Sequence, residues 1–175
     1  QQTCQRNRGW KQDELNALKM VYWKQIEDMV GSETTTQLKE RTVSILDIRW
    51  KNIDDRGMNL LIPALAHMKM LKGVDIRNNK YGKEGAVKLV KLLEKYSTIQ
   101  TFNTIPLYQL QTAVQLDISN KQLIDGDMMV IGEFLKRNTS LVALDAYMNN
   151  FGKDGATVIG EVIKTCSLQK LNLLQ

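Results

Sequence analysis

The stretch "LKGVDIRNNKYGKEGAVKLVKLLEKYSTI", residues 71–99, decides the fold, because a later stretch of the chain repeats its plan. The later stretch is "LVALDAYMNNFGKDGATVIGEVIKTCSL", residues 141–168, at a constant offset of 70 residues. An echo of this length indicates an internal repeat. The matching positions are Asn79 with Asn149, Gly82 with Gly152, and Gly85 with Gly155.

Three apolar residues in the spacing L-x-x-L-x-L define the repeated unit. Alternation of apolar and polar residues over so short a run predicts a strand. Successive units are spaced by 28, 28, 14, 28 and 27 residues, so the offset of 70 contains one half-length unit. The units begin at Val43, Leu71, Ile99, Ala113, Leu141 and Leu168.

A helical pattern follows four of these strands. Ala86, Leu89, Val90 and Leu93 lie at the i, i+3, i+4, i+7 spacing of one helix face. No single strand–helix unit buries its own apolar face, so the pattern predicts a stacked solenoid in which neighbours complete the core. The equivalent faces are Met58, Leu61, Ile62, Leu65; Met128, Ile131, Gly132, Leu135; and Ala156, Ile159, Gly160, Ile163.

These two stretches resemble the ribonuclease-inhibitor-like class of leucine-rich repeats, over residues 42–175. The resemblance implies an α/β fold: a horseshoe-shaped solenoid with a parallel sheet on its concave side and helices on its convex side. It implies no particular function, because proteins of this class have many unrelated ligands.

The repeat is irregular in several places. Lys51 and Lys121 stand where the asparagine is expected, Asp127 replaces a glycine, and Pro63 lies inside the first helix. The short unit at about 99–112 contains Pro106 and is predicted to have no helix. A half-length unit should change the curvature or leave a gap on the helical side.

Residues 1–41 precede the repeats and are predicted to contain one helix, over about 10–30. Leu15, Leu18, Tyr22, Ile26 and Met29 share one face of it, and Gly31 ends it. This helix either caps the first repeat or docks on another protein. Trp10 and Trp23 suit both roles.

Composition fits an ordinary globular protein, with 43% hydrophobic residues and a net charge of +5. No apolar run is long enough for a membrane span, and no signal peptide is visible, although a removed transit peptide would leave no trace. Cys4 and Cys166 are far apart and are expected to be free thiols. The expected location is intracellular, with cytoplasm and organelle both open.

Catalytic and metal-binding patterns were sought without success. His67 is the only histidine, so nucleophile–base pairs and zinc sites have no sequence support. The run from Asp125 to Asp127 lacks the spacing of a calcium loop, and its place in the repeat predicts a turn before a helix. The expectation is a protein that is not an enzyme, with no cofactor, no metal and no evident small-molecule substrate.

The side chains at the outward positions of the strands do not pack in the core, so these positions are the candidate binding surface. The aspartates among them are expected to accept hydrogen bonds from turn amides or to pair with arginines. Trp50, Arg49, Arg77, Tyr147 and Met148 are the candidate anchors, since aromatic, Met and Arg side chains are enriched at interfaces. The candidate protein-binding residues are Asp47, Arg49, Trp50, Asp75, Arg77, Asn78, Asp117, Asp145, Tyr147 and Met148.

The last unit is expected to leave Leu168, Leu171 and Leu173 uncapped, so that either further chain or another protein covers this edge. Together with the strand positions, this predicts a non-catalytic interaction or structural subunit that binds other proteins in a larger assembly. The net charge favours an alternative, a basic module of a ribonucleoprotein or an anionic surface, although the scattered Lys and Arg make nucleic acid the weaker choice. The third possible function is an inhibitor that binds an enzyme.

Overall fold

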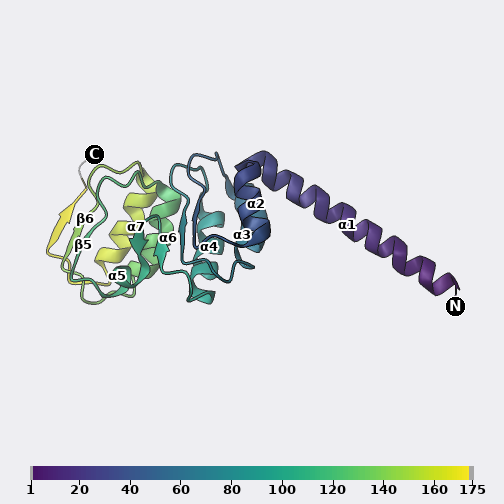
Figure 1. Ribbon diagram of the computed structural model, residues 1–175. Coiled ribbons are helices and arrows are strands. Elements are labelled where there is room, and N and C mark those ends of the chain that lie inside the picture. Colours follow the sequence, from purple (N-terminus) through teal and green to yellow (C-terminus); the bar gives the residue numbers. More distant parts are fainter. Residues whose placement is uncertain (1, 174–175) are drawn as a thin grey trace.

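The computed structural model describes the backbone of residues 2–173 and the side chains of residues 12–173. Figure 1 shows a body of short strands and packed helices, from which one long helix projects. The helices are α1 Gln2–Val30, α2 Ser32–Glu40, α3 Asp55–Leu65, α4 Lys83–Lys95, α5 Leu107–Thr112, α6 Asp125–Leu135 and α7 Lys153–Ile163. The strands are β1 Ile45–Asp47, β2 Gly73–Asp75, β3 Thr101–Phe102, β4 Ile105–Pro106, β5 Gln115–Asp117, β6 Ala143–Asp145 and β7 Lys170–Asn172.

Helix α1 is longer than predicted and is followed by a second helix, α2. Gly31 separates the two with a φ of 91°, which glycine adopts without steric cost. Only the C-terminal part of α1 packs on the body: Ile26 is buried, and the Tyr22 hydroxyl donates to the Leu60 carbonyl at 2.9 Å. Leu15 and Leu18 continue the same face but are exposed, so the predicted packing face is confirmed only from Tyr22 onward. The side chains of Cys4 and Trp10 lie outside the described residues.

Each sheet keeps the register that the repeat predicts. In the first sheet, β1 to β4, parallel pairing aligns Leu46 with Val74. In the second sheet, β5 to β7, parallel pairing aligns Leu116 with Leu144. Within each sheet the middle apolar residue of one unit therefore lies beside its counterpart in the next, and these four side chains are buried.

The predicted leucine-rich-repeat solenoid, an arc with one continuous parallel sheet, is wrong, and so is the ribonuclease-inhibitor-like architecture. The described strands form two short sheets, and β4 runs antiparallel to β3. Asn103 and Thr104 turn the chain with φ of 50° and 67°, so β4 occupies the edge of β3 that β5 would have extended. The shortened unit thus ends the first sheet.

The shortened unit also has a helix, contrary to the prediction for residues 99–112. Helix α5 begins directly after Pro106, a position where the missing amide proton costs no helical hydrogen bond. Leu107 and Leu110 bury one side of it. On the helical side α4 packs directly on α6, so the four long repeat helices follow one another as α3, α4, α6 and α7.

Two buried asparagines, Asn79 and Asn149, explain why the repeated stretches share an Asn at this position. The Asn79 side chain accepts from the amides of Lys51 and Ile53 at 3.1 and 3.0 Å. It donates to the carbonyls of Ile48 and Ile76 at 2.9 and 2.6 Å. Each asparagine thereby joins its own unit to the previous one. Asn149 makes the same four bonds, to Lys121, Leu123, Ile118 and Ala146.

The repeated glycines are explained by an aspartate of the preceding unit. The Asp55 carboxylate accepts from the amides of Gly82 and Gly85, at 2.9 and 2.7 Å, at the start of α4. A Cβ at Gly85 would lie 2.8 Å from that carboxylate oxygen, which excludes a larger residue. Asp125 serves Gly152 and Gly155 in the same way.

Asp127, at the irregular glycine position, is a buried link between the two halves of the body. It accepts from the Tyr81 hydroxyl and the Asn103 side-chain amide, both at 2.5 Å, and from the Ile124 amide at 3.0 Å. Burial raises the pKa of Asp127 to about 6, against these three hydrogen bonds, which lower it. Asp127, in the first turn of α6, therefore connects this helix to Tyr81, just before α4, and to Asn103, just after β3.

Candidate functional site

The strand face, defined by the ten predicted binding residues listed above, carries neutralised carboxylates in the first sheet. Arg49 binds Asp47 with two guanidinium nitrogens, Nε at 3.0 Å and Nη2 at 2.7 Å. Arg77 binds Asp75 in the same two-pronged way, at 2.8 and 2.6 Å. These pairs confirm the expected Asp–Arg pairing, and the hydrogen bond from Arg49 holds the pKa of Asp47 below its usual value.

The second sheet has the same aspartate column but no arginines. Asp117 accepts from the Ser119 amide at 2.8 Å, and Asp145 from the Tyr147 amide at 3.0 Å. The Asn172 side-chain amide adds a long contact of 3.3 Å to Asp145. Neither carboxylate has an ion pair within residues 12–173. Hydrogen bonding from Ser119 keeps the pKa of Asp117 low, so this carboxylate is ionised at neutral pH.

Large apolar side chains stand out from the strand face. Trp50 is 68% exposed, Met148 51% and Tyr147 39%. Trp50 and Met148 have positive φ values, 58° and 52°. Asn78 and Asn120 hold the same position in other units, and asparagine suits this left-handed conformation better than bulky residues.

Direct contacts join the strand face across the break between the sheets. The Arg77 guanidinium donates to the Lys121 carbonyl at 3.3 Å, and the Asn78 amide donates to Gln122 Oε1 at 2.7 Å. The turn after β2 therefore lies against the turn after β5. The strand face is therefore continuous across the break, although two sheets carry it and Asp75 within it is buried. Their role in binding remains a prediction.

The predicted edge at the last unit is only partly open. Leu168 and Leu173 are half-buried and pack against the core, whereas Leu171 is 40% exposed. Strand β7 pairs with β6 alone among the described strands. Leu171 is thus the apolar residue that this strand presents.

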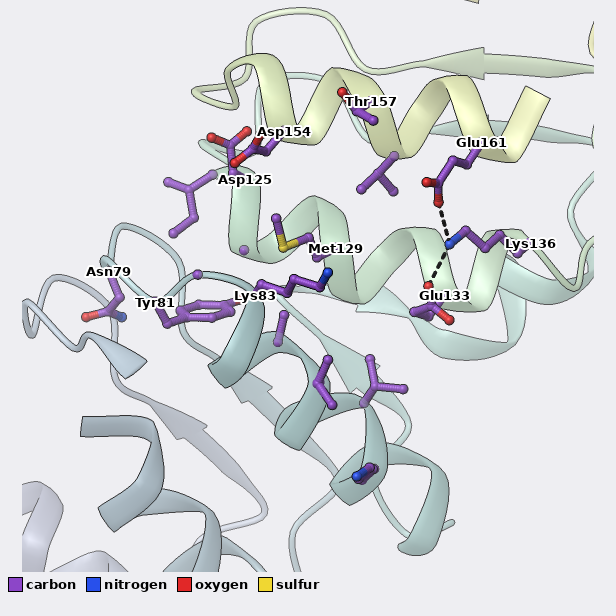
Figure 2. A pocket seen from close by; sticks show the side chains of 18 of the residues that line it. Asn79, Tyr81, Lys83, Asp125, Met129, Glu133, Lys136, Asp154, Thr157 and Glu161 are labelled. Atoms are coloured by element: carbon purple, nitrogen blue, oxygen red, sulfur yellow. Dashed lines mark hydrogen bonds and ion pairs between the residues drawn. The ribbon is translucent and has the colours of Figure 1, made fainter. Parts of the chain in front are cut away.

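A groove on the helical side was not predicted. It has a volume of about 960 Å³ and lies between α4, α6 and α7 (Figure 2). Val87, Val90, Met129 and Val158 supply its apolar lining. At one end Lys136 bridges Glu133 and Glu161, each at 2.7 Å, so these charges are already paired. Two residues in the sequence could have indicated this groove: Val87 and Val158 are apolar but lie just outside the repeated helix faces.

Residues 12–173 offer little that could hold a metal ion or perform acid–base chemistry. That part of the chain holds no group of three or more His, Cys, Asp or Glu side chains placed to bind a metal. His67 is exposed, and its Nδ1 lies 2.7 Å from the Pro63 carbonyl, an acceptor, so Nδ1 carries the proton. Cys166 is a half-buried free thiol. None of the helices described has the length and apolar character needed to cross a membrane.

Comparisons with known proteins identify no family for this chain. No protein-family model matches the chain, and no curated protein sequence does. Among solved structures it is similar to one titled "Leiomodin-1 Actin-Binding Site 2 (ABS2)", at 16% identity and a TM-score of 0.43. That alignment covers 82% of this chain and 78% of the other. At this TM-score the likeness carries no argument about function.

Proposed function

We propose that the chain is a non-catalytic protein-binding subunit that recognises its partner through the strand face. The observation that carries the proposal is the pair Trp50 and Met148. Each places a large apolar side chain in solvent at a left-handed backbone position, where the equivalent residues are asparagines. Strained residues persist where they serve a function. Tyr147, beside Met148, extends this apolar surface.

The other proposed functions have less support. A nucleic-acid partner would meet two carboxylates without cationic neighbours, Asp117 and Asp145, on the second sheet, and these repel phosphates. The cations Arg49 and Arg77 already hold carboxylates. A basic module would therefore have to use another surface. The helical groove has an apolar lining but no feature that identifies an occupant.

Photo-crosslinking in an extract of the native source tests the proposal. A photoreactive phenylalanine analogue is placed at Tyr147, on the strand face, or at Tyr108, an aromatic residue of α5 that is 65% exposed. We expect a discrete crosslinked protein from position 147 and not from position 108. Equal labelling from both positions would contradict the assignment of the surface.

The captured protein is then purified and its affinity measured. Trp50→Asn and Met148→Asn should each weaken binding by about tenfold or more, the size of an interface hot spot. Tyr108→Ala, the matched control, should leave the affinity unchanged. Unchanged affinity in both strand-face variants would disprove the proposal.

A further inference from the structure

The two sheets contain the same pair of aspartates in the same register. Asp47 lies opposite Asp75 in the first sheet, and Asp117 lies opposite Asp145 in the second. Two residues after each of the first pair stands an arginine. In the second sheet Ser119 and Tyr147 occupy those places. The second sheet thus presents the same carboxylates without the arginines. Neutral side chains contact them instead: Ser119 hydrogen-bonds Asp117, and the Asn172 amide lies 3.3 Å from Asp145.

The first sheet shows how a guanidinium fits between such carboxylates. Arg49 bonds Asp47 with Nη2 at 2.7 Å, and its Nε lies 3.6 Å from Asp75 on the next strand. One guanidinium therefore contacts carboxylates of two neighbouring strands, which lie about 4.8 Å apart. The first sheet thus shows that a pair of aspartates in this register has room for one guanidinium.

The chain's own cations do not fill the equivalent place in the second sheet. Lys121 lowers the pKa of Asp117 only weakly, as the last of its causes. Neither Lys121 nor Lys170 forms an ion pair within residues 12–173. Above the strands a hollow of about 520 Å³ is lined by Asp117, Asp145 and Lys170, among others.

We propose that the protein partner inserts an arginine side chain between Asp117 and Asp145, beside the ring of Tyr147. This inference rests on the proposed function and specifies the partner's chemistry. Arginine suits the place better than lysine, because its planar fork binds a carboxylate with two parallel hydrogen bonds. An exposed tyrosine ring adds a face on which a guanidinium stacks.

An NMR titration tests this directly, with ¹³C-aspartate-labelled protein and N-acetylarginine amide as the probe. We expect the carboxyl signals of Asp117 and Asp145 to shift together, while those of Asp47 and Asp75, already bound, stay in place. N-acetylcitrulline amide has the same shape without the charge and should give no shift. Shifts of equal size with citrulline, or none with arginine, would overturn the proposal.

Two kinds of variant sharpen the result. Asp117→Asn and Asp145→Asn should each weaken binding of N-acetylarginine amide by about tenfold, because a charge-assisted bidentate contact is lost. Ser119→Arg together with Tyr147→Arg reproduces the first sheet and should prevent the shifts by filling the place internally. Retained probe binding in that double variant, with its fold intact by circular dichroism, would contradict the assignment.

The outcome is separable from that of the proposed function. If crosslinking at Tyr147 captures a partner but the probe fails, the strand face binds a protein by other chemistry. If neither works, the strand face itself is wrong. Binding of the partner that survives Asp117→Asn and Asp145→Asn also rejects the arginine.

Discussion

Trp50 and Met148 lie three residues after β1 and β6, strands of different sheets, in the same left-handed conformation, with φ of 58° and 52°. Asn78 and Asn120 hold this position in two other units, at 59° and 51°. Asparagine tolerates the conformation because its short polar side chain hydrogen-bonds locally, whereas larger side chains are strained. Two exposed positions of the strand face therefore combine backbone strain with apolar surface.

Trp50→Asn and Met148→Asn are expected to stabilise the fold. Each should raise the free energy of unfolding by about 0.5–1 kcal/mol, since strain is relieved and little buried contact is lost. Urea denaturation measures this. Asn120→Met, the reverse change, should lower the free energy by a similar amount. A loss of stability in both asparagine variants would show that the exposed side chains support the fold.

Asn79→Ala and Asn149→Ala should be strongly destabilising. Each substitution leaves two buried carbonyls and two amides without their partner, and we expect a loss of about 3 kcal/mol or more. Asn150→Ala, at an exposed neighbour, is the control and should change stability by less than about 0.5 kcal/mol. Equal effects at positions 149 and 150 would show that the Asn149 hydrogen bonds do not stabilise the fold.

Apolar spacing predicted the strand register and the helix faces, because these features depend on residues close together in the chain. Leu46, Val74, Leu116 and Leu144 are buried and paired as their 28-residue spacing requires. Asp–Arg pairing two residues apart was predictable for the same reason. The strand face as a set of positions follows directly from this register.

The division into two sheets could not be predicted from spacing. It depends on the left-handed turn at Asn103 and Thr104, which returns β4 along β3. Asp127 is 46 residues from Tyr81 and 24 residues from Asn103, so no local sequence pattern predicts these two hydrogen bonds. Leu15 and Leu18 were predicted to share the packed face of α1 but are exposed. An apolar helix face in the sequence does not show how far along the helix the packing partner extends.

Two helical glycines, Gly126 in α6 and Gly160 in α7, should respond oppositely to alanine. A Cβ at Gly126 would overlap the Tyr81 carbonyl oxygen and ring, so Gly126→Ala should cost about 1–3 kcal/mol. At Gly160, inside α7, nothing lies within 4 Å of the added carbon. Gly160→Ala should therefore add about 0.5–1 kcal/mol through helix propensity. Thermal unfolding of the two variants beside the parent decides it; a loss at Gly160 contradicts the prediction.

Asp127 should make the protein less stable as pH rises. Because its folded pKa is about 6 and its ordinary value is 3.8, the unfolded chain releases the proton first. Between these values the folded state binds more protons, so the group's contribution to stability is full below pH 3.8 and is lost as pH approaches 6 and beyond. The full change corresponds to about 3 kcal/mol.

Asp127→Asn isolates this effect, because the amide cannot titrate and the other carboxylates are common to both proteins. Asp47 and Asp117 have lowered pKa values and contribute in the opposite direction, but their effect cancels in the difference. The variant loses the bond from the Ile124 amide, so it should be less stable than the parent at pH 4. That deficit should shrink by about 2 kcal/mol, or reverse, between pH 4 and pH 7. Urea unfolding at pH 4, 5, 6 and 7 measures it. A deficit that stays constant, or grows with pH, means that the three donors around Asp127 outweigh its burial.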